Sequence, residues 1–374
     1  MSEYQYYEFQ SLDRPLSASA QAEMESLSSR VYLTANSASF VYNYGDFRGN
    51  PYNVLVKHFD VMLYIANWGS RRLMFRFPAD AIPITVRETY QYADSMDWSD
   101  SGEYAILDIR QEDEDGFGWV EGEGLLRGIA QVRNDILRGD YRSLYLAWLM
   151  VALQELYVLE DDEDLAEPPV PVGLHKLSPN LRNFIDFFEI GMDLVNAAAQ
   201  GSSNQSLPES PLVNYLNKLP DNEKLDYLKR LLAGEAYLDV TLAKRLRELA
   251  GVDAVSLPTN DQPRTIRQLM TLADQVKAAR LEKERQQAEA ARKKHLEKVA
   301  KLEDAYWERV PQLIEQKRAN TYDEAVSILK DLRDLAAQRG ELSDFQARMR
   351  DIQKTYPTLR GLHHRLQNAR LFQS

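Results

Sequence analysis

The stretch from Arg264 to Arg309 constrains the fold of this chain more than any other part of the sequence. It contains neither glycine nor proline, and it is rich in alanine, lysine, glutamate, glutamine and arginine, which are among the strongest helix formers. A helix over this whole range would be about 69 Å long, because each residue adds about 1.5 Å. We therefore expect one long, charged helix in the second half of the chain.

The apolar residues of this stretch gather at its two ends. From Glu282 to His295 the only apolar residues are alanines. The composition is typical of coiled coils, but a coiled-coil seam needs apolar a and d positions throughout. The pattern instead predicts a bridging helix with a solvated middle and ends that pack in cores. The apolar residues are Ile266, Leu269, Ala273 and Val276 at the start, and Leu296, Val299, Leu302, Tyr306 and Trp307 at the end.

Pro311 follows this stretch and is expected to kink or restart the helix. Beyond it, apolar side chains recur at helical spacing as far as Ala369. These stripes predict a small C-terminal helical bundle that includes the distal end of the long helix, with Trp307 as an anchor.

Charge is distributed unevenly over the 374 residues. The chain has 45 basic and 57 acidic side chains, and residues 1–174 hold 13 of the basic and 29 of the acidic ones. Residues 260–374 hold 23 basic and 17 acidic side chains, so the front of the chain should repel polyanions and the back should attract them weakly. The chain has no cysteine, which excludes disulfides, thiol catalysis and cysteine-ligated zinc.

The first third of the chain predicts an α+β module. Alternating apolar residues, such as Val61, Leu63 and Ile65, indicate strands, and Asn50 followed by Pro51 indicates a helix start. The expected fold class is α+β, with an N-terminal module of mixed helices and sheet followed by a mainly α-helical region. The domains expected are an aromatic-rich module over 1–115, core helices packed on it over 116–158, an acidic proline-rich linker over 159–175, a short-helix domain over 176–255, and the long helix with its bundle over 264–374.

Six residues beside turns of the first module are candidates for binding, because sites usually lie on loops held by a sheet. Aromatic strands beside arginines are typical of platforms for single-stranded nucleic acid, although the negative charge of this region opposes phosphate. Turn capping and surface ion pairs are the alternative interpretation. The candidates are Asp46, Arg48, Trp68, Arg71, Arg72 and Arg76.

The charged helix carries a second set of candidates. Its basic residues could contact phosphates without reading sequence, although acidic residues are interspersed among them. A solvated surface without a ligand is the alternative. The candidate phosphate contacts are Arg285, Arg292, Lys293, Lys294 and Lys298.

An enzyme would need a site that the sequence does not display. His58, just before Asp60, is the only histidine within the α+β module, and a pocket that joined it to Asp46 and Arg71 would support catalysis. The acidic run at 112–115 does not have the spacing of an EF-hand loop. We expect no metal and no cofactor.

Several short motifs resemble a family of bacterial proteins of unknown function. They are Tyr4–Phe9 with Leu12–Leu16, Gly45–Gly49 and Ala66–Gly69 near the start, and Tyr322–Val326 with Leu329–Ala336 near the end. Because these motifs lie near both ends of the sequence, we expect the resemblance to cover the whole chain. Genes of that family often neighbour one for a SWIM-type zinc-finger protein, which implies nucleic-acid-linked machinery. The family supplies no catalytic residues.

The expected function is that of a non-enzymatic scaffold or adaptor in a bacterial cytoplasmic assembly. It would bind protein partners through the aromatic module and the basic helical tail. A nucleic-acid-associated accessory factor and an enzyme with an unrecognised site in the first module are the alternatives. The most apolar run, Leu144–Leu153, is too short for a membrane span, and no targeting segment is visible at the N-terminus. The oligomeric state is left open, and a homo-oligomer is one alternative.

Overall fold

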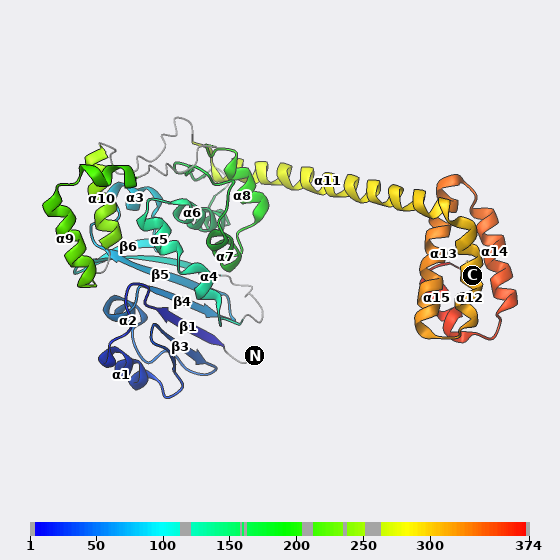
Figure 1. The fold of residues 1–374 in the computed structure, drawn as a ribbon, viewed down its shortest axis with the longest axis horizontal. Helices are drawn as coiled ribbons and strands as arrows, with labels where there is room; N and C mark the ends of the chain where they lie inside the picture. Colours follow the sequence, from blue (N-terminus) through cyan, green and yellow to red (C-terminus); the bar gives the residue numbers. More distant parts are fainter. Residues whose placement is uncertain are drawn as a thin grey trace. The chain divides into compact units, whose positions relative to one another are not determined.

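The computed structural model describes residues 4–112, 121–157, 159–160, 163–203, 212–234, 238–250 and 263–371. The chain divides into two compact units, Met1–Lys277 and Ala278–Ser374 (Figure 1). The acidic residues 113–115 and the glycine-rich residues 116–119 lie outside the described residues.

Unit 1 is built on an antiparallel sheet, which the described residues form with seven strands in the order β2-β3-β1-β4-β5-β7-β6. The α+β fold class is confirmed. The alternation predicted for Val61, Leu63 and Ile65 lies in β4, while β2 and β6 were not predicted. The strands are β1 (Gln5–Gln10), β2 (Tyr32–Leu33), β3 (Ser37–Tyr42), β4 (Val61–Ala66), β5 (Ser70–Pro78), β6 (Met96–Ser101) and β7 (Tyr104–Glu112).

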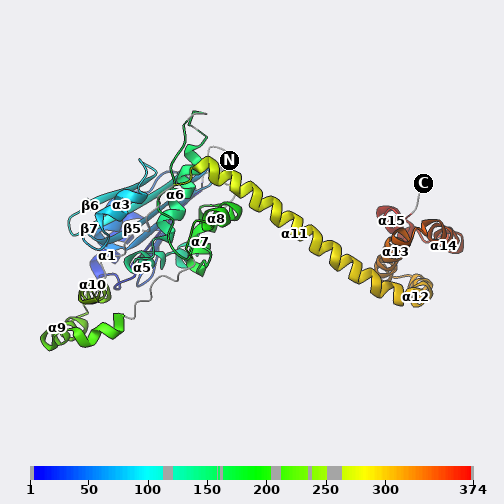
Figure 2. The same ribbon diagram turned by 90° about the horizontal axis from the view of Figure 1, so that it is seen from above.

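The two faces of the sheet carry separate apolar cores (Figures 1 and 2). On one face Phe9, Met62 and Met74 pack with α1 (Ala18–Leu27) and α2 (Pro51–His58). The opposite face packs against a larger helical layer. That layer consists of α3 (Ile84–Tyr90), α4 (Leu125–Ile129), α5 (Val132–Leu137), α6 (Arg142–Glu155), α7 (Pro179–Phe187) and α8 (Met192–Ala199).

The local signals of the sequence account for several of these elements. Asn50 caps α2, because its Oδ1 accepts hydrogen bonds from the backbone N–H of Tyr52 at 2.9 Å and of Asn53 at 3.3 Å, and Pro51 is the first helical residue. Helix α6 is buried at every position from Ser143 to Ala152, as expected of a central helix that is apolar on all sides.

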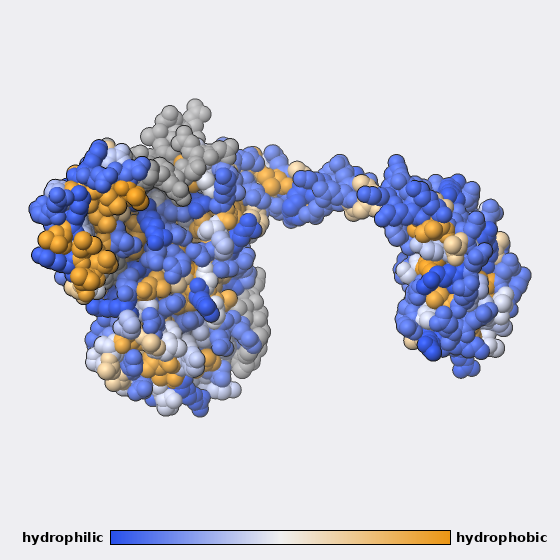
Figure 3. Space-filling view, in the orientation of Figure 1, coloured by the Kyte–Doolittle hydropathy of each residue, from blue (hydrophilic) through white to orange (hydrophobic). Residues whose placement is uncertain are grey.

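Three helices in the last part of unit 1 leave apolar side chains exposed. They are a 3-10 helix, η1 (Leu212–Lys218), followed by α9 (Asp221–Leu232) and α10 (Leu238–Ala250). On α9 the exposed fractions of the leucines run from 54% for Leu225 to 89% for Leu232. Figure 3 shows these apolar side chains gathered at its left edge, over α9 and α10.

Helix α11 runs over Ile266–Lys301 and takes part in both units. Near its start, Ile266, Leu269 and Ala273 are buried in the core of unit 1. Near its end, Leu296 and Val299 are buried in the core of unit 2. Every residue from 277 to 291 is exposed, which agrees with the predicted solvated middle.

The long helix is shorter than the sequence predicts. It ends at Lys301, the chain turns at Leu302, and α12 (Glu303–Glu315) follows. The turn allows Val299 of α11 and Val310 of α12 to be buried in the same core. Pro311 was expected to kink or restart the helix, but it lies inside α12. The prediction of one continuous helix to Arg309 was therefore wrong.

Unit 2 is the predicted helical bundle. Its core joins the end of α11 with the four helices that follow, and Trp307 packs against that core with its ring 5.9 Å from the ring of Phe345. The guanidinium of Arg348 lies 4.7 Å from the centre of the Trp307 ring. The helices are α12, α13 (Ala319–Arg339), α14 (Leu342–Thr355) and α15 (Arg360–Asn368).

Candidate binding site at one end of the sheet

The strand register brings several of the predicted loop residues to one end of the sheet. Gln5 of β1 pairs with the last residues of both β3 and β4, and Ile65 of β4 pairs with Arg71 of β5. The loops that carry Asp46 and Trp68 therefore emerge at the same end as Arg71. The side-chain Nε2 of Gln5 donates to the Asp46 Oδ1 at 3.4 Å, which ties the first loop to the sheet.

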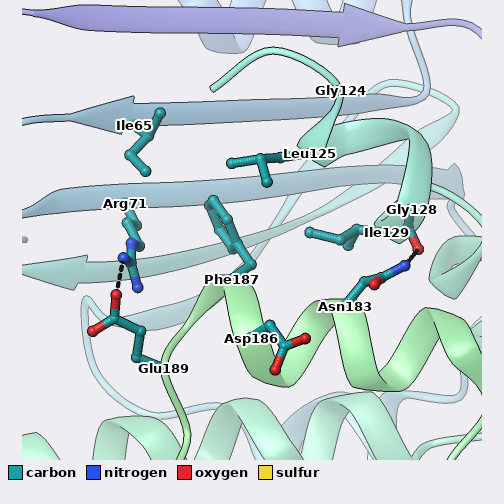
Figure 4. A pocket seen from close by; sticks show the side chains of 10 residues that line it. All are labelled: Ile65, Arg71, Gly124, Leu125, Gly128, Ile129, Asn183, Asp186, Phe187 and Glu189. Carbon is teal, nitrogen blue, oxygen red and sulfur yellow. Dashed lines mark hydrogen bonds and ion pairs between the residues drawn. The ribbon is translucent and has the colours of Figure 1, made fainter. Parts of the chain in front are cut away.

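A cavity of about 330 Å³ opens at this end, between the sheet and two helices of the layer that covers it (Figure 4). Its walls come from β4, β5, α4 and α7. Apolar side chains make up much of the lining, together with three charged groups and an amide. The lining residues are Ile65, Arg71, Gly124, Leu125, Gly128, Ile129, Asn183, Asp186, Phe187 and Glu189.

Helices α4 and α7 approach each other closely at Gly128. The Asn183 Nδ2 donates to the Gly128 carbonyl oxygen at 3.1 Å. A Cβ added at Gly128 would lie 2.4 Å from that same Nδ2, which is too close for a non-bonded contact. A side chain at position 128 would therefore displace the Asn183 side chain from this hydrogen bond.

Arg71 is the one cation among the residues that line the cavity, and it is only 3% exposed. Its Nη2 donates to the Glu189 Oε1 at 2.5 Å, and its guanidinium lies 5.7 Å from the centre of the Phe187 ring. A buried charge is costly unless it is compensated. Glu189 supplies a compensating carboxylate, although 57% of its own side chain is exposed to solvent.

Glu189 holds an uncommon backbone conformation directly after α7. Its φ is +51°, and the N–H of Ile190 donates to the Ile185 carbonyl oxygen at 3.0 Å, which is the Schellman pattern of a helix end. The left-handed position of that motif is usually glycine, and another residue there costs roughly 1–2 kcal/mol. Position 189 nevertheless carries a glutamate, and its side chain reaches Arg71.

The remaining predicted arginines of β5 are bound within the fold. Arg72 lies on the opposite face from Arg71 and makes two hydrogen bonds to the Asp108 carboxylate, at 2.8 Å and 2.6 Å. Arg76 donates to Asp60 at 2.8 Å, and its guanidinium lies 4.5 Å from the centre of the Tyr104 ring. The three arginines thus do not share one surface. Arg48 and Trp68 are exposed.

The three residues considered for a catalytic site do not lie together. Asp46 and Arg71 lie at one end of the sheet, whereas His58 precedes β4 and lies at the other end. There the His58 Nε2 is 2.9 Å from the Glu23 Oε2. Asp60 is fully buried at that end, between the guanidiniums of Arg76 at 2.8 Å and Arg133 at 3.5 Å.

The predicted phosphate contacts of α11 fall on different faces of the helix. Arg285 pairs with Glu282 at 3.0 Å and with Glu289 at 3.3 Å, while Arg292 pairs with Asp331 at 2.9 Å and also with Asp334. Successive residues of a helix are rotated by about 100° around its axis. Five basic residues of α11 therefore fall within a sector of about 60°, on the side away from Leu296 and Val299. We call it the lysine face: Arg280, Lys283, Lys294, Lys298 and Lys301.

No family model matches this chain, and neither the curated proteins nor the solved structures include a significant match. Among the described residues, no group of three or more His, Cys, Asp or Glu side chains is placed to hold a metal ion. No helix in that part of the chain is both long and apolar enough to span a membrane.

The buried ion pairs of Asp60 with Arg76 and Arg133 predict that unit 1 loses stability in acid. Burial opposes ionisation of Asp60, but Arg133 and Arg76 outweigh it and hold the pKa of this carboxyl below its usual value. The carboxylate therefore adds stability above about pH 4, and this is lost as the pH falls toward the lowered pKa. Asp60→Asn should lower the free energy of unfolding at pH 7 by about 3–5 kcal/mol and flatten its dependence on pH below about 4.

Chemical denaturation followed at several pH values measures both effects. Asp80→Asn is the control, because the Asp80 side chain is 82% exposed and its pair with Lys244 should be worth less than about 1 kcal/mol. Equal losses for the two variants would contradict the assignment of Asp60 as a buried ion-pair centre.

Proposed function

We propose that this protein is a non-enzymatic adaptor of a bacterial cytoplasmic assembly, in which each unit binds a different partner. The observation that carries the proposal is the course of α11. The helix begins in the core of unit 1 and ends in the core of unit 2, and the residues between them are exposed on every side. A helix of this kind joins two folded units through its ends and leaves the surface of its middle unpacked.

The opposite charges of the two units favour partners of different chemistry. Residues 1–277 contain 25 basic and 42 acidic side chains, whereas residues 278–374 contain 20 and 15. The lysine face adds a local concentration of positive charge to α11. Unit 2 is therefore suited to an acidic partner, which unit 1 as a whole would repel.

Unit 1 offers the exposed leucines of α9 as its partner surface. Leu225, Leu228 and Leu232 share one side of the helix, and all three are more than half exposed. Lys224 and Lys229 flank this stripe on its two sides. An amphipathic helix with acidic residues beside its apolar stripe would complement both features, so we propose such a helix as the protein partner of unit 1.

Two sets of substitutions in the tagged full-length chain test the adaptor proposal. Leu228→Asp with Leu232→Asp should abolish capture of one set of proteins after cross-linking in cells. Reversal of four lysine-face charges, Lys283, Lys294, Lys298 and Lys301 to Glu, should abolish capture of a different set. Each loss should reappear when the identified partner is purified and titrated against the variant.

Matched controls carry the same chemical change elsewhere on the surface. Ile84→Asp with Leu342→Asp places two aspartates on other exposed apolar positions. Charge reversal at Lys330, Arg350, Lys354 and Arg360 alters unit 2 outside the lysine face. If both test variants lose the same single partner, or if the controls lose as much as they do, the two-partner adaptor is excluded.

The lysine face also favours a second candidate, a nucleic-acid-associated accessory factor. Lys283, Lys294, Lys298 and Lys301 are exposed along one side of α11 and could contact phosphates without reading bases. Contact by all four with duplex DNA would give a slope of about −3.6 in log K against log salt concentration.

Electrophoretic or fluorescence titration with single- and double-stranded DNA and RNA measures this slope. The fourfold lysine-face reversal should remove binding, while the fourfold control reversal in unit 2 should retain it. Absence of binding by the native chain at about 50 mM salt, where phosphate contacts are strong, would eliminate this candidate.

A further inference from the structure

We propose that the cavity between β4, β5, α4 and α7 binds a small α-amino acid with an apolar side chain. The ligand carboxylate would bind Arg71, its ammonium group would lie near Asp186 and Glu189, and its side chain would contact the apolar wall. This inference concerns unit 1 alone and does not depend on the adaptor function.

The carboxylate subsite follows from the position of Arg71. Its guanidinium is almost completely removed from bulk water, yet it borders the cavity beside Phe187 and Glu189 (Figure 4). A guanidinium presents a planar fork of N–H donors that matches a carboxylate. A charged donor at the edge of a low-dielectric cavity therefore selects an anionic group on a ligand.

Glu189 is suited to give up its contact with Arg71. More than half of its side chain already faces solvent, so its carboxylate can be hydrated as soon as it leaves the guanidinium. Its left-handed backbone adds strain that a change in the turn after α7 can relieve. A ligand carboxylate would then replace one ion pair of Arg71 by another, and the buried cation would stay compensated.

The charge of the lining favours a zwitterion over a simple anion. Arg71 contributes one positive charge, while Asp186 and Glu189 contribute two negative charges. Figure 4 shows both carboxylates on the α7 side of the cavity, with the Phe187 ring between Arg71 and Leu125. A ligand that brought only a carboxylate would increase the excess of negative charge. An α-amino acid brings an ammonium group together with it.

The remaining walls define the size and polarity of the ligand side chain. Ile65, Leu125, Ile129 and Phe187 present an apolar surface beside the charged groups. At Gly128, α4 is tied to α7 by the hydrogen bond from the Asn183 side chain. A volume of about 330 Å³ is at the small end of ligand sites, which suits leucine or phenylalanine better than a peptide or a nucleotide.

Isothermal titration of the full chain with leucine and phenylalanine tests the proposal. Two leucine analogues separate the charged subsites: 4-methylpentanoate lacks the ammonium group, and isopentylamine lacks the carboxylate. We expect at least one of the two amino acids to bind, and each leucine analogue to bind at least tenfold more weakly than leucine if leucine is the ligand. No heat from either amino acid up to about 10 mM, or equal binding of leucine and 4-methylpentanoate, would overturn the proposal.

Variants locate the binding in this cavity. Leu125→Trp should fill it and abolish binding, whereas Ile84→Trp on an exposed surface should leave binding unchanged. Asp186→Asn should weaken leucine binding several-fold without weakening that of 4-methylpentanoate. Circular dichroism and thermal unfolding verify that each variant is folded. Native affinity in a folded Leu125→Trp variant, or tighter binding of an acetylated peptide ending in leucine, would contradict the assignment.

Discussion

The buried ion pair between Glu167 and Arg264 fixes the point from which α11 leaves unit 1. The Glu167 side chain is completely buried, and its two oxygens accept hydrogen bonds from Arg264 at 2.7 Å each. The hydroxyl of Tyr145 donates to the same carboxylate, and burial raises the pKa of that hydroxyl. Arg264 also donates to the carbonyl oxygen of Ala198 at 2.9 Å. The Glu167–Arg264 pair thus joins α6, α8 and the residues that precede α11.

This pair also gives a structural role to a segment that composition assigns to a linker. The backbone N–H of Glu167 donates to the Arg264 carbonyl oxygen at 2.7 Å, and Ala166 forms a β-bridge with Thr265. The segment therefore fastens the start of α11 to unit 1, where Ile266 and Leu269 of this helix are buried in the core. The adaptor proposal depends on this attachment, because it anchors the start of α11 in unit 1.

Much of the fold follows from local sequence signals, whereas the site does not. Alternation in β4 and β5 and the cap at Asn50 act over a few residues, so their outcome can be predicted from those residues alone. The turn at Leu302 has no glycine or proline to mark it. It arises because Val299 and Val310 are buried in one core, and such tertiary packing overrides the helix propensity of the neighbouring residues.

The cavity depends even more on residues that are distant from one another in the sequence. Arg71 and Glu189 are separated by 118 positions, and no spacing or motif in the sequence connects them. Arg71, Arg72 and Arg76 are close together in the sequence, but the pleat of β5 places Arg71 on one face of the sheet and the other two on the opposite face. Glu189, Asn183 and Phe187 were missed because their role depends on how α7 packs against α4. A left-handed glutamate after a helix leaves no signal in the sequence.

The absence of cysteine from the sequence allows the most direct test of the central claim about α11. Single cysteines can be placed at Leu269, Ala273, Gln287, Ala290 and Val299, and their reaction with a maleimide can be timed in the native chain. The account predicts that Gln287 and Ala290 react about as fast as in the unfolded chain, whereas the other three positions are strongly protected. Protection at Gln287 or Ala290 equal to that at Val299 would contradict it.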